Sequence, residues 1–295
     1  MYDISSFYQA KSVDDAIEAL NRDPEAVVIS GGTDLLIKLR SGEYSDRALI
    51  SMRGLGELTG VEKQPDGTIV IKPCTCFTDI IKDPVINETL PALSNAADQV
   101  GSPQIRNVGT IGGNICNGAA SADAAPPLLV YNAALEFRDE NGVSAVPIRD
   151  FYTGPGKTVC KHTQILTAVK ISKSDYESFG AHYIKFGVRN AMEIATIGCA
   201  ASVRLSGDRT VIEELRIAFG VAAPTPIRCP ETEKEMSRLP VCSDTLALIG
   251  NSVLKEVSPR DSWRASKTFR LQLIRELSKR AVKTAAENAG GVFDA

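Results

Sequence analysis

The chain has 295 residues, of which 43% are hydrophobic and 23% are charged. This composition is typical of a globular protein large enough for two domains, and it excludes intrinsic disorder, collagen-like repeats and a disulfide scaffold. The 33 basic and 36 acidic residues nearly cancel, leaving a net charge of −3, so we expect no binding to nucleic acid or to an anionic membrane.

The N-terminal segment and the cysteines predict a cytoplasmic protein. Residues 1–5 lack the basic and apolar stretches of a secretory signal, and no apolar run approaches the about 18 residues of a membrane span. The seven cysteines are scattered and odd in number, which favours reduced thiols. Cys74 and Cys76 have a strand-like context, so we expect both to pack on one face of a sheet. We expect no metal site, since about four ligands in workable spacing are missing.

Short helices and strands are expected around glycine-rich turns in the first half of the chain. Ser12 begins a capping box, which predicts an amphipathic helix through Leu20. The run 26–30 predicts a strand buried on both faces, and Asp34 begins a further helix through Leu39. We also expect a strand at 49–52, a hairpin between 59 and 71 with Pro65-Asp66-Gly67 as its turn, a helix at 90–100 and a glycine-rich loop at 109–118.

Longer strands and then helices are expected in the second half. Asn141-Gly142 predicts another hairpin. The remaining expected elements are strands at 165–171, 181–187, 195–205 and 211–220, helices after Pro230 and a long last helix at about 265–288.

These elements predict an α+β fold of two domains. The first is expected at 1–176, with two α/β subdomains at about 1–55 and 56–176. The second is a smaller α+β domain at 177–295, with an antiparallel three-stranded sheet and helices.

The first glycine cluster, from Ile29 to Asp34, lies where a buried strand turns into a helix. Successive backbone N–H groups in such a turn form a concave nest, and the start of a helix adds partial positive charge. Glycine allows close approach by a phosphate because it carries no side chain. The cluster therefore predicts an anion site, with an ordinary turn as the alternative.

The second cluster runs from Gly109 to Gly118 and on to Asp123. Its three glycines at 109, 112 and 113 are expected to offer backbone donors. Thr110, Asn114 and Asn117 add neutral hydrogen-bonding side chains, and Asp123 adds a carboxylate for a ribose or ribityl hydroxyl. Two such nests with few lysines suit a pyrophosphate, and a purely structural loop is the alternative.

Other motifs give no catalytic site. The segment 154–158 ends like a Walker A loop, but Phe151 stands where the first glycine is required. No G-x-G-x-x-G fingerprint follows a strand. Neither His162 nor His182 belongs to a convincing catalytic triad, so we expect no catalytic residue and leave the chemistry to a cofactor.

Residues 29–34 and 104–114 together resemble the paired FAD-binding signature of molybdenum hydroxylases. More narrowly, they resemble the separate FAD-binding subunits of bacterial xanthine dehydrogenases, which are flavoproteins of the CO-dehydrogenase type. Further matches at 151–157, 194–199 and 262–267 extend the resemblance over nearly the whole chain. It implies non-covalent FAD in a vanillyl-alcohol-oxidase-like (PCMH-type) FAD-binding domain, followed by the C-terminal domain typical of these flavoproteins.

The resemblance also implies the cofactor-binding residues. The two glycine segments would wrap the pyrophosphate, Asp123 would serve the polar part of FAD, Ile165 would pack on the flavin ring and Lys185 would lie near it. Val100 stands where some relatives carry an aromatic side chain against the flavin. The expected residues are Val27, Val28, Ile29, Ser30, Gly31, Gly32, Thr33, Asp34, Gly109, Thr110, Ile111, Gly112, Gly113, Asn114, Asn117, Asp123, Ile165 and Lys185.

The implied function is electron transfer in purine metabolism. A partner subunit with molybdopterin and molybdenum would hydroxylate a purine, and another would pass electrons through [2Fe–2S] clusters to this FAD. The FAD would reduce NAD⁺ or another acceptor, in a dimer of heterotrimers. The alternatives are an FAD subunit that serves another purine or N-heterocycle, a self-contained flavin oxidase, and an assembly protein that has lost its cofactor.

Overall fold

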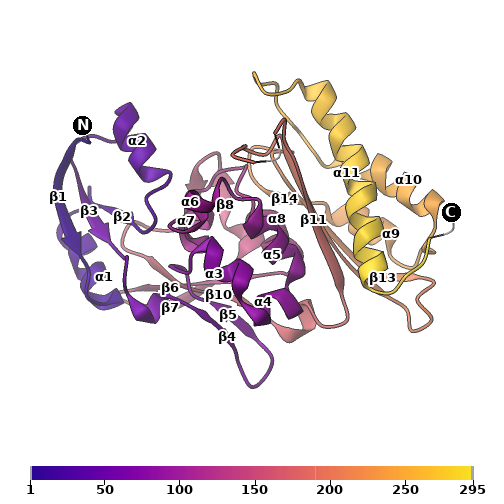
Figure 1. Cartoon of the computed structure of the whole chain (residues 1–295), viewed down its shortest axis with the longest axis horizontal. Helices are drawn as coiled ribbons and strands as arrows, with labels where there is room; N and C mark the ends of the chain where they lie inside the picture. Colours follow the sequence, from indigo (N-terminus) through magenta and orange to yellow (C-terminus); the bar gives the residue numbers. More distant parts are fainter. Residues whose placement is uncertain (1, 190, 294–295) are drawn as a thin grey trace.

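The computed structural model describes residues 2–189 and 191–293, so Met1 and Ala295, the outer ends of the two expected domains, lie outside the described residues. Figure 1 shows three consecutive groups of elements, each built around one sheet, with the N-terminal group at one end and the C-terminal helices at the other. The mixture of parallel and antiparallel sheets with segregated helices is the α+β architecture that the sequence predicts.

The first sheet has the order β1-β3-β2 and is parallel throughout. Its strands are β1 (Ile4–Gln9), β2 (Val27–Ile29) and β3 (Arg47–Ser51), with α1 (Val13–Arg22) and α2 (Leu35–Ser41) in the connections. Helix α1 begins as predicted, because the Ser12 hydroxyl accepts a hydrogen bond from the Asp15 N–H at 3.1 Å. The expectation that β2 is buried on both faces is wrong, since Val28 is 37% exposed.

The second sheet has five strands in the order β4-β5-β10-β6-β7, and its neighbours are all antiparallel. The two predicted hairpins supply four of its strands, and the predicted strand at 165–171 lies in the centre as β10. The strands are β4 (Val61–Lys63), β5 (Ile69–Ile71), β6 (Ala134–Asp139), β7 (Gly142–Pro147) and β10 (Ile165–Ile171). A separate two-stranded ribbon joins β8 (Tyr152–Gly154) to β9 (Lys157–Thr158).

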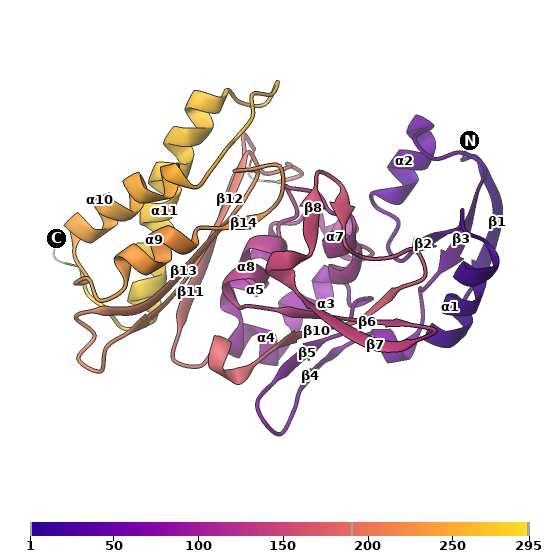
Figure 2. The ribbon, with the colours of Figure 1, turned by 180° about the vertical axis from the view of Figure 1, so that it is seen from behind.

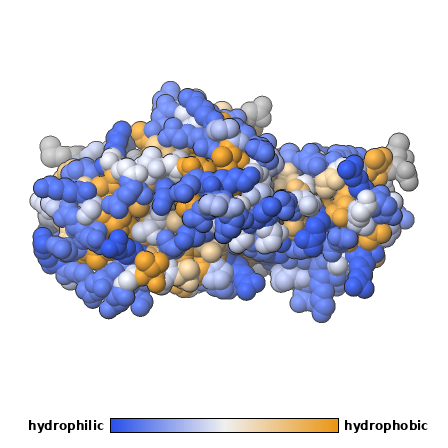
Figure 3. Space-filling view, turned by 90° about the horizontal axis from the view of Figure 1, so that it is seen from below, coloured by the Kyte–Doolittle hydropathy of each residue, from blue (hydrophilic) through white to orange (hydrophobic). Residues whose placement is uncertain are grey.

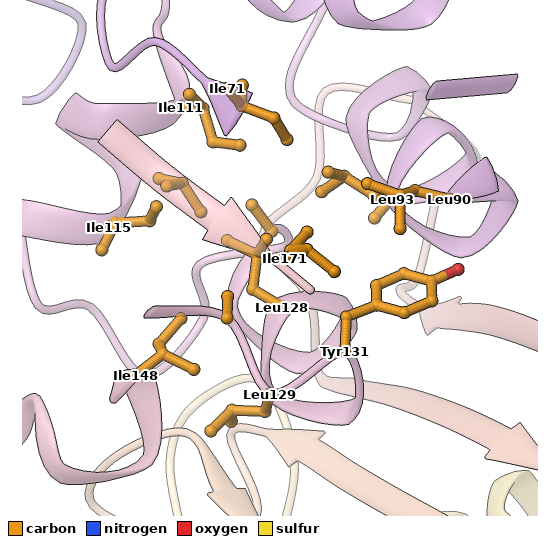
Figure 4. Packing of buried hydrophobic residues seen from close by; sticks show 14 of the residues in the cluster. Ile71, Leu90, Leu93, Ile111, Ile115, Leu128, Leu129, Tyr131, Ile148 and Ile171 are labelled. Carbon is orange, nitrogen blue, oxygen red and sulfur yellow. The ribbon is translucent and has the colours of Figure 1, made fainter. Parts of the chain in front are cut away.

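Six short helices lie beside this sheet: α3 (Phe77–Lys82), α4 (Pro84–Thr89), α5 (Pro91–Asp98), α6 (Pro103–Arg106), α7 (Ile111–Cys116) and α8 (Ala125–Val130). Figure 4 shows Ile111 and Ile115 of α7 in the same apolar cluster as Ile71 and Ile171 of the sheet. The predicted loop at 109–118 is therefore partly helical, because this apolar pair anchors one face of α7. Cys74 and Cys76 lie in the connection between β5 and α3, so the prediction that they share a strand is wrong.

The third sheet is antiparallel and has the order β11-β12-β13-β14. It contains the three predicted strands as β11 (Gly180–Phe186), β12 (Ile197–Leu205) and β13 (Ile212–Gly220), and adds β14 (Ile227–Arg228). The expected count of three is wrong because β14 has two residues, too few for a visible alternation. Helices α9 (Pro230–Met236), α10 (Ser243–Ser252) and α11 (Lys267–Asn288) cover its outer face (Figure 2).

The three groups of elements are joined by apolar packing. The inner face of the third sheet contacts α5 and α8 of the central group, and Ala200 and Ala218 belong to the central core. The view in Figure 3 shows a mostly hydrophilic face with hydrophobic residues interspersed. Short 3-10 helices complete the fold at Gly56–Leu58, Ile148–Asp150, Lys173–Asp175 and Val253–Lys255. In the part of the chain that the structure describes, no helix has the length and apolar character to cross a membrane.

Candidate cofactor-binding site

A cleft of about 730 Å³ is bounded by residues from all three groups of elements. Its volume lies in the range of pockets that bind cofactors and other small molecules. Sixteen of the eighteen sequence-predicted residues line it. The two that do not are Ile111, which is fully buried in the core beneath α7, and Lys185, which lies behind Asp123.

The loop after β2 presents free backbone donors to this cleft. In residues 2–189 and 191–293, the N–H groups of Gly31, Gly32, Thr33 and Asp34 donate no hydrogen bond. Gly32 has a φ of 72°, a left-handed conformation that glycine adopts without strain. Four successive free N–H groups at the wall of a cleft form a site for an anion.

The loop at 109–114 uses its backbone differently, and the expectation of three free glycine donors is wrong. The N–H of Gly109 donates to the Ile105 carbonyl at 2.6 Å, and that of Gly112 donates to the Pro73 carbonyl at 2.8 Å. The N–H of Gly113 donates to Oγ1 of Thr110, which is the N-cap of α7. These glycines serve the packing of the loop, and Gly113 also leaves the wall of the cleft open, since a Cβ there would meet only Thr110 Oγ1.

The two loops approach each other closely. A Cβ on Gly31 would lie 2.0 Å from the carbonyl oxygen of Val108, so no larger residue fits there without movement. Side chains link the loops as well, because Thr110 Oγ1 donates to Ser30 Oγ at 3.2 Å and Asn117 Nδ2 donates to Asp34 Oδ2 at 3.2 Å. Gly31 therefore allows the two loops to meet, and together with Gly32 it supplies two of the four free N–H groups.

One polar atom of the second loop remains without a partner. Oδ1 of Asn114 is buried and accepts no hydrogen bond within the described residues, although Asn114 lines the cleft. A buried oxygen of this kind is costly unless a bound group donates to it. The free N–H groups of the first loop and this oxygen fit a ligand that carries both a diphosphate and hydroxyl or amine donors.

A buried carboxylate lies at the wall of the cleft. Asp123 accepts hydrogen bonds from the Tyr183 hydroxyl at 2.8 Å and from Lys185 Nζ at 2.7 Å, and Lys185 also donates to the Gln99 carbonyl. Burial raises the pKa of Asp123, and the charge of Lys185 opposes this shift. The pair joins the central group of elements to β11 at the cofactor cleft.

Sequence reasoning missed Tyr183, which is fully buried beside Asp123. The spacing of Tyr183 and Lys185 carries a signal, because residues two apart on a strand share a face. Burial, and then the nearby Asp123, raise the pKa of Tyr183, so its hydroxyl keeps its proton and acts as a donor.

Three thiols and one histidine also line the cleft, namely Cys74, Cys116, Cys160 and His162. Burial raises the pKa of Cys160 to about 11 and that of Cys116 further, so both are protonated at neutral pH. His162 is exposed, and its Nε2 lies 3.2 Å from the Leu20 carbonyl and 3.1 Å from that of Asp23. Among the described residues, no three His, Cys, Asp or Glu side chains are grouped to hold a metal ion.

The family of the chain follows from comparison with known proteins. Residues 2–174 match the family described as the FAD binding domain in molybdopterin dehydrogenase, and residues 182–285 match the CO dehydrogenase flavoprotein C-terminal domain. Since the first match covers more than half of the chain, the chain belongs to this family of FAD-binding oxidoreductase components. This confirms the resemblance seen in the glycine segments and the FAD cofactor that it implies.

Particular relatives are similar over their full lengths. The chain is 46% identical over 291 residues to the xanthine dehydrogenase FAD-binding subunit of Escherichia coli O157:H7, covering 99% of each chain. It is 26% identical over 280 residues to the carbon monoxide dehydrogenase medium chain of Hydrogenophaga pseudoflava, covering 95% of this chain and 96% of the other.

A solved structure supports the fold. A chain of the carbon monoxide dehydrogenase from Hydrogenophaga pseudoflava that lacks the Mo-pyranopterin moiety superposes with a TM-score of 0.92. The sequence identity is 25%, and the match covers 98% of this chain and 99% of the other. The expected arrangement, an FAD-binding domain followed by a domain with an antiparallel sheet and helices, is confirmed.

Proposed function

We propose that the chain is the FAD-carrying electron-transfer subunit of a xanthine-dehydrogenase-like molybdenum hydroxylase. The observation that carries this proposal is the set of four free N–H groups at 31–34 in a chain that belongs to an FAD-binding family. The choice of a xanthine-type enzyme is supported by the 46% identity to the E. coli subunit, against 26% to the carbon monoxide dehydrogenase chain.

Different residues of the cleft would bind different parts of the cofactor. The N–H groups at 31–34 would bind the pyrophosphate, and the second loop would close over it. Asp123 would accept from a hydroxyl of the cofactor, Ile165 would pack on the flavin ring, and Lys185, which holds Asp123 from behind, would lie near the ring, each as the resemblance implies. When bound, FAD supplies the electron-carrying chemistry that no side chain here provides. Ile111 acts through the core, because its side chain anchors α7 away from the cleft.

The proposed route passes electrons from [2Fe–2S] clusters on one partner subunit through this FAD to NAD⁺ or another acceptor. A further subunit would carry molybdopterin with molybdenum, and the whole would form a dimer of heterotrimers. The relatives named as medium chains support membership in such an assembly. The seven free cysteines support the cytoplasm as its location.

The proposed domain limits are 1–176 and 177–295, with subdomains at about 1–55 and 56–176. The sheets support this division, because the strands of the first sheet end at Ser51 and those of the third begin at Gly180.

The test is an absorbance spectrum of the chain purified alone, followed by identification of the cofactor released on denaturation. We expect flavin bands, release of FAD and no turnover of xanthine. A protein that stays colourless after incubation with FAD, or that releases FMN, contradicts the cofactor assignment. Oxidation of xanthine by the isolated chain contradicts the division of labour between subunits.

A further inference from the structure

A second cavity of about 450 Å³ adjoins the cofactor cleft. It lies between the loops of the central group and the segment that leads into α11, and it shares Lys38, Asn117, Ala119, Ser121, Gly156 and Ile194 with the cleft. A molecule in this cavity therefore borders directly on the cofactor site.

Among the described residues, the charged side chains that line this cavity are all basic. Its lining includes Lys38, Arg260, Arg264 and Arg270, and no Asp or Glu among the described residues. The chain as a whole has a small net negative charge, so a lining with basic charges alone differs from the overall charge of the protein. In the described parts of the chain, none of the three arginines forms an ion pair. The nearby Asp261 accepts a hydrogen bond from the Lys267 N–H at 2.6 Å through Oδ1, and it forms no ion pair with the three arginines.

Arg270 is a buried cation that forms no ion pair with any of the described residues. It is 2% exposed, and its Nη atoms donate to the Thr196 carbonyl and to Ser262 Oγ. The Nε atoms of Arg270 and Arg264 are buried and have no partner within residues 2–189 and 191–293. Burial, and then the charges of Arg260 and Arg264, lower the pKa of Arg270, and the charge of Asp261 opposes this shift. An anion in the cavity would offset both the burial and the repulsion.

We propose that this cavity is a second anion site, which binds the diphosphate of a dinucleotide other than FAD. Guanidinium groups match phosphate oxygens in charge and in geometry, and the neutral hydroxyls of Ser258 and Ser262 add hydrogen-bonding capacity. The first loop already offers four backbone donors for the diphosphate of FAD. The shared wall would let a molecule held by its phosphates reach the flavin, so this inference rests on the proposed function and gives the electron acceptor a site.

The test uses the FAD-loaded chain and ADP-ribose, which carries a diphosphate but no redox-active ring. We expect calorimetric titration to detect binding that weakens as salt is raised. Arg264→Gln and Arg260→Gln should each weaken it about tenfold or more, because a charged hydrogen bond is lost. Arg264→Lys should recover part of the affinity. Arg280→Gln is the matched control, since Arg280 is an exposed residue of α11 that lines neither cavity.

Other outcomes overturn the proposal. They are an absence of ADP-ribose binding to the FAD-loaded chain, or an equal loss of affinity in Arg280→Gln. Loss of FAD from Arg264→Gln at an unchanged melting temperature would assign the arginines to the diphosphate of FAD itself. Arg260 is exposed, so Arg260→Gln keeps the test available if Arg264→Gln fails to fold. The FAD content of the unsubstituted chain tests the proposed function separately.

Discussion

The loops at 30–34 and 109–114 meet at the cofactor cleft, and they use glycine for different purposes. At 31–34 the backbone donors point at no protein acceptor in the described residues, so the loop is prepared for an anion. At 109–113 the glycine N–H groups are already bonded, and the small residues let the loop pack on Pro73 and on helix α6. A run of glycines thus indicates close approach, and only the structure tells whether a ligand or the protein itself comes close.

The largest expected effect comes from Gly112→Glu, which tests whether this glycine of the second loop serves packing or ligand binding. Gly112→Glu puts its Cβ 2.5 Å from Pro73 Cβ and 2.7 Å from the Pro73 carbonyl oxygen. We expect loss of about 4 kcal/mol or more of folding stability, because overpacking and a buried charge act together. Denaturant unfolding of the FAD-free protein checks this. The substitution therefore does not test the phosphate site, although the sequence alone suggests that it would. A stable variant that fails only in FAD binding would show that Gly112 faces the ligand.

Gly113→Glu is the matched variant one residue further on. Gly113 is exposed, and a Cβ there would meet only Thr110 Oγ1, at 3.1 Å. We expect the carboxylate to enter the cleft and repel the diphosphate, weakening FAD binding about a hundredfold, or about 2.7 kcal/mol. The melting temperature of the FAD-free protein should stay near that of the unsubstituted chain. Fluorescence titration with FAD measures the loss, and unchanged affinity would remove the second loop from the diphosphate site.

A third prediction concerns the buried carboxylate beside both loops. Tyr183→Phe removes a hydrogen bond to Asp123 and is expected to cost about 1.5–3 kcal/mol at neutral pH. Burial raises the pKa of Asp123, and this hydrogen bond to the ionised carboxylate opposes the shift, so the contribution of the bond is present above that pKa and lost as pH falls through it. The difference in unfolding free energy between the two proteins should therefore shrink in acid. A difference that is constant with pH would mean that Tyr183 acts through packing alone.

The parts of the fold that the sequence predicts are those with local signals. The Ser12 cap and the Asn141-Gly142 turn each involve only a few neighbouring residues. The pattern of α11 repeats over many helical turns. Strand β1 gives no such signal because its six residues are all exposed. Helix α7 has six residues, too few for periodicity to distinguish it from a loop.

Within the site, too, the predicted residues are those with a local signal. The glycine segments are local, and most of the residues predicted from them line the cleft. Tyr183 contacts Asp123 across 60 residues of sequence, and the arginines of the second cavity lie against loops from four other parts of the chain. These contacts depend on how the sheets pack against one another, and no single stretch of the sequence predicts that packing.

The smallest expected effect tests the link between the two loops. Asn117→Ala removes the hydrogen bond from Asn117 Nδ2 to Asp34 Oδ2, which is exposed, so the cost to stability should be about 1 kcal/mol or less. Because Asp34 also carries one of the free N–H groups, loosening it should weaken FAD binding by about two- to fivefold. Asn87→Ala provides a control, since Asn87 forms an exposed side-chain hydrogen bond away from the cleft. Equal FAD affinities in the two variants would mean that the first loop holds its shape without help from the second.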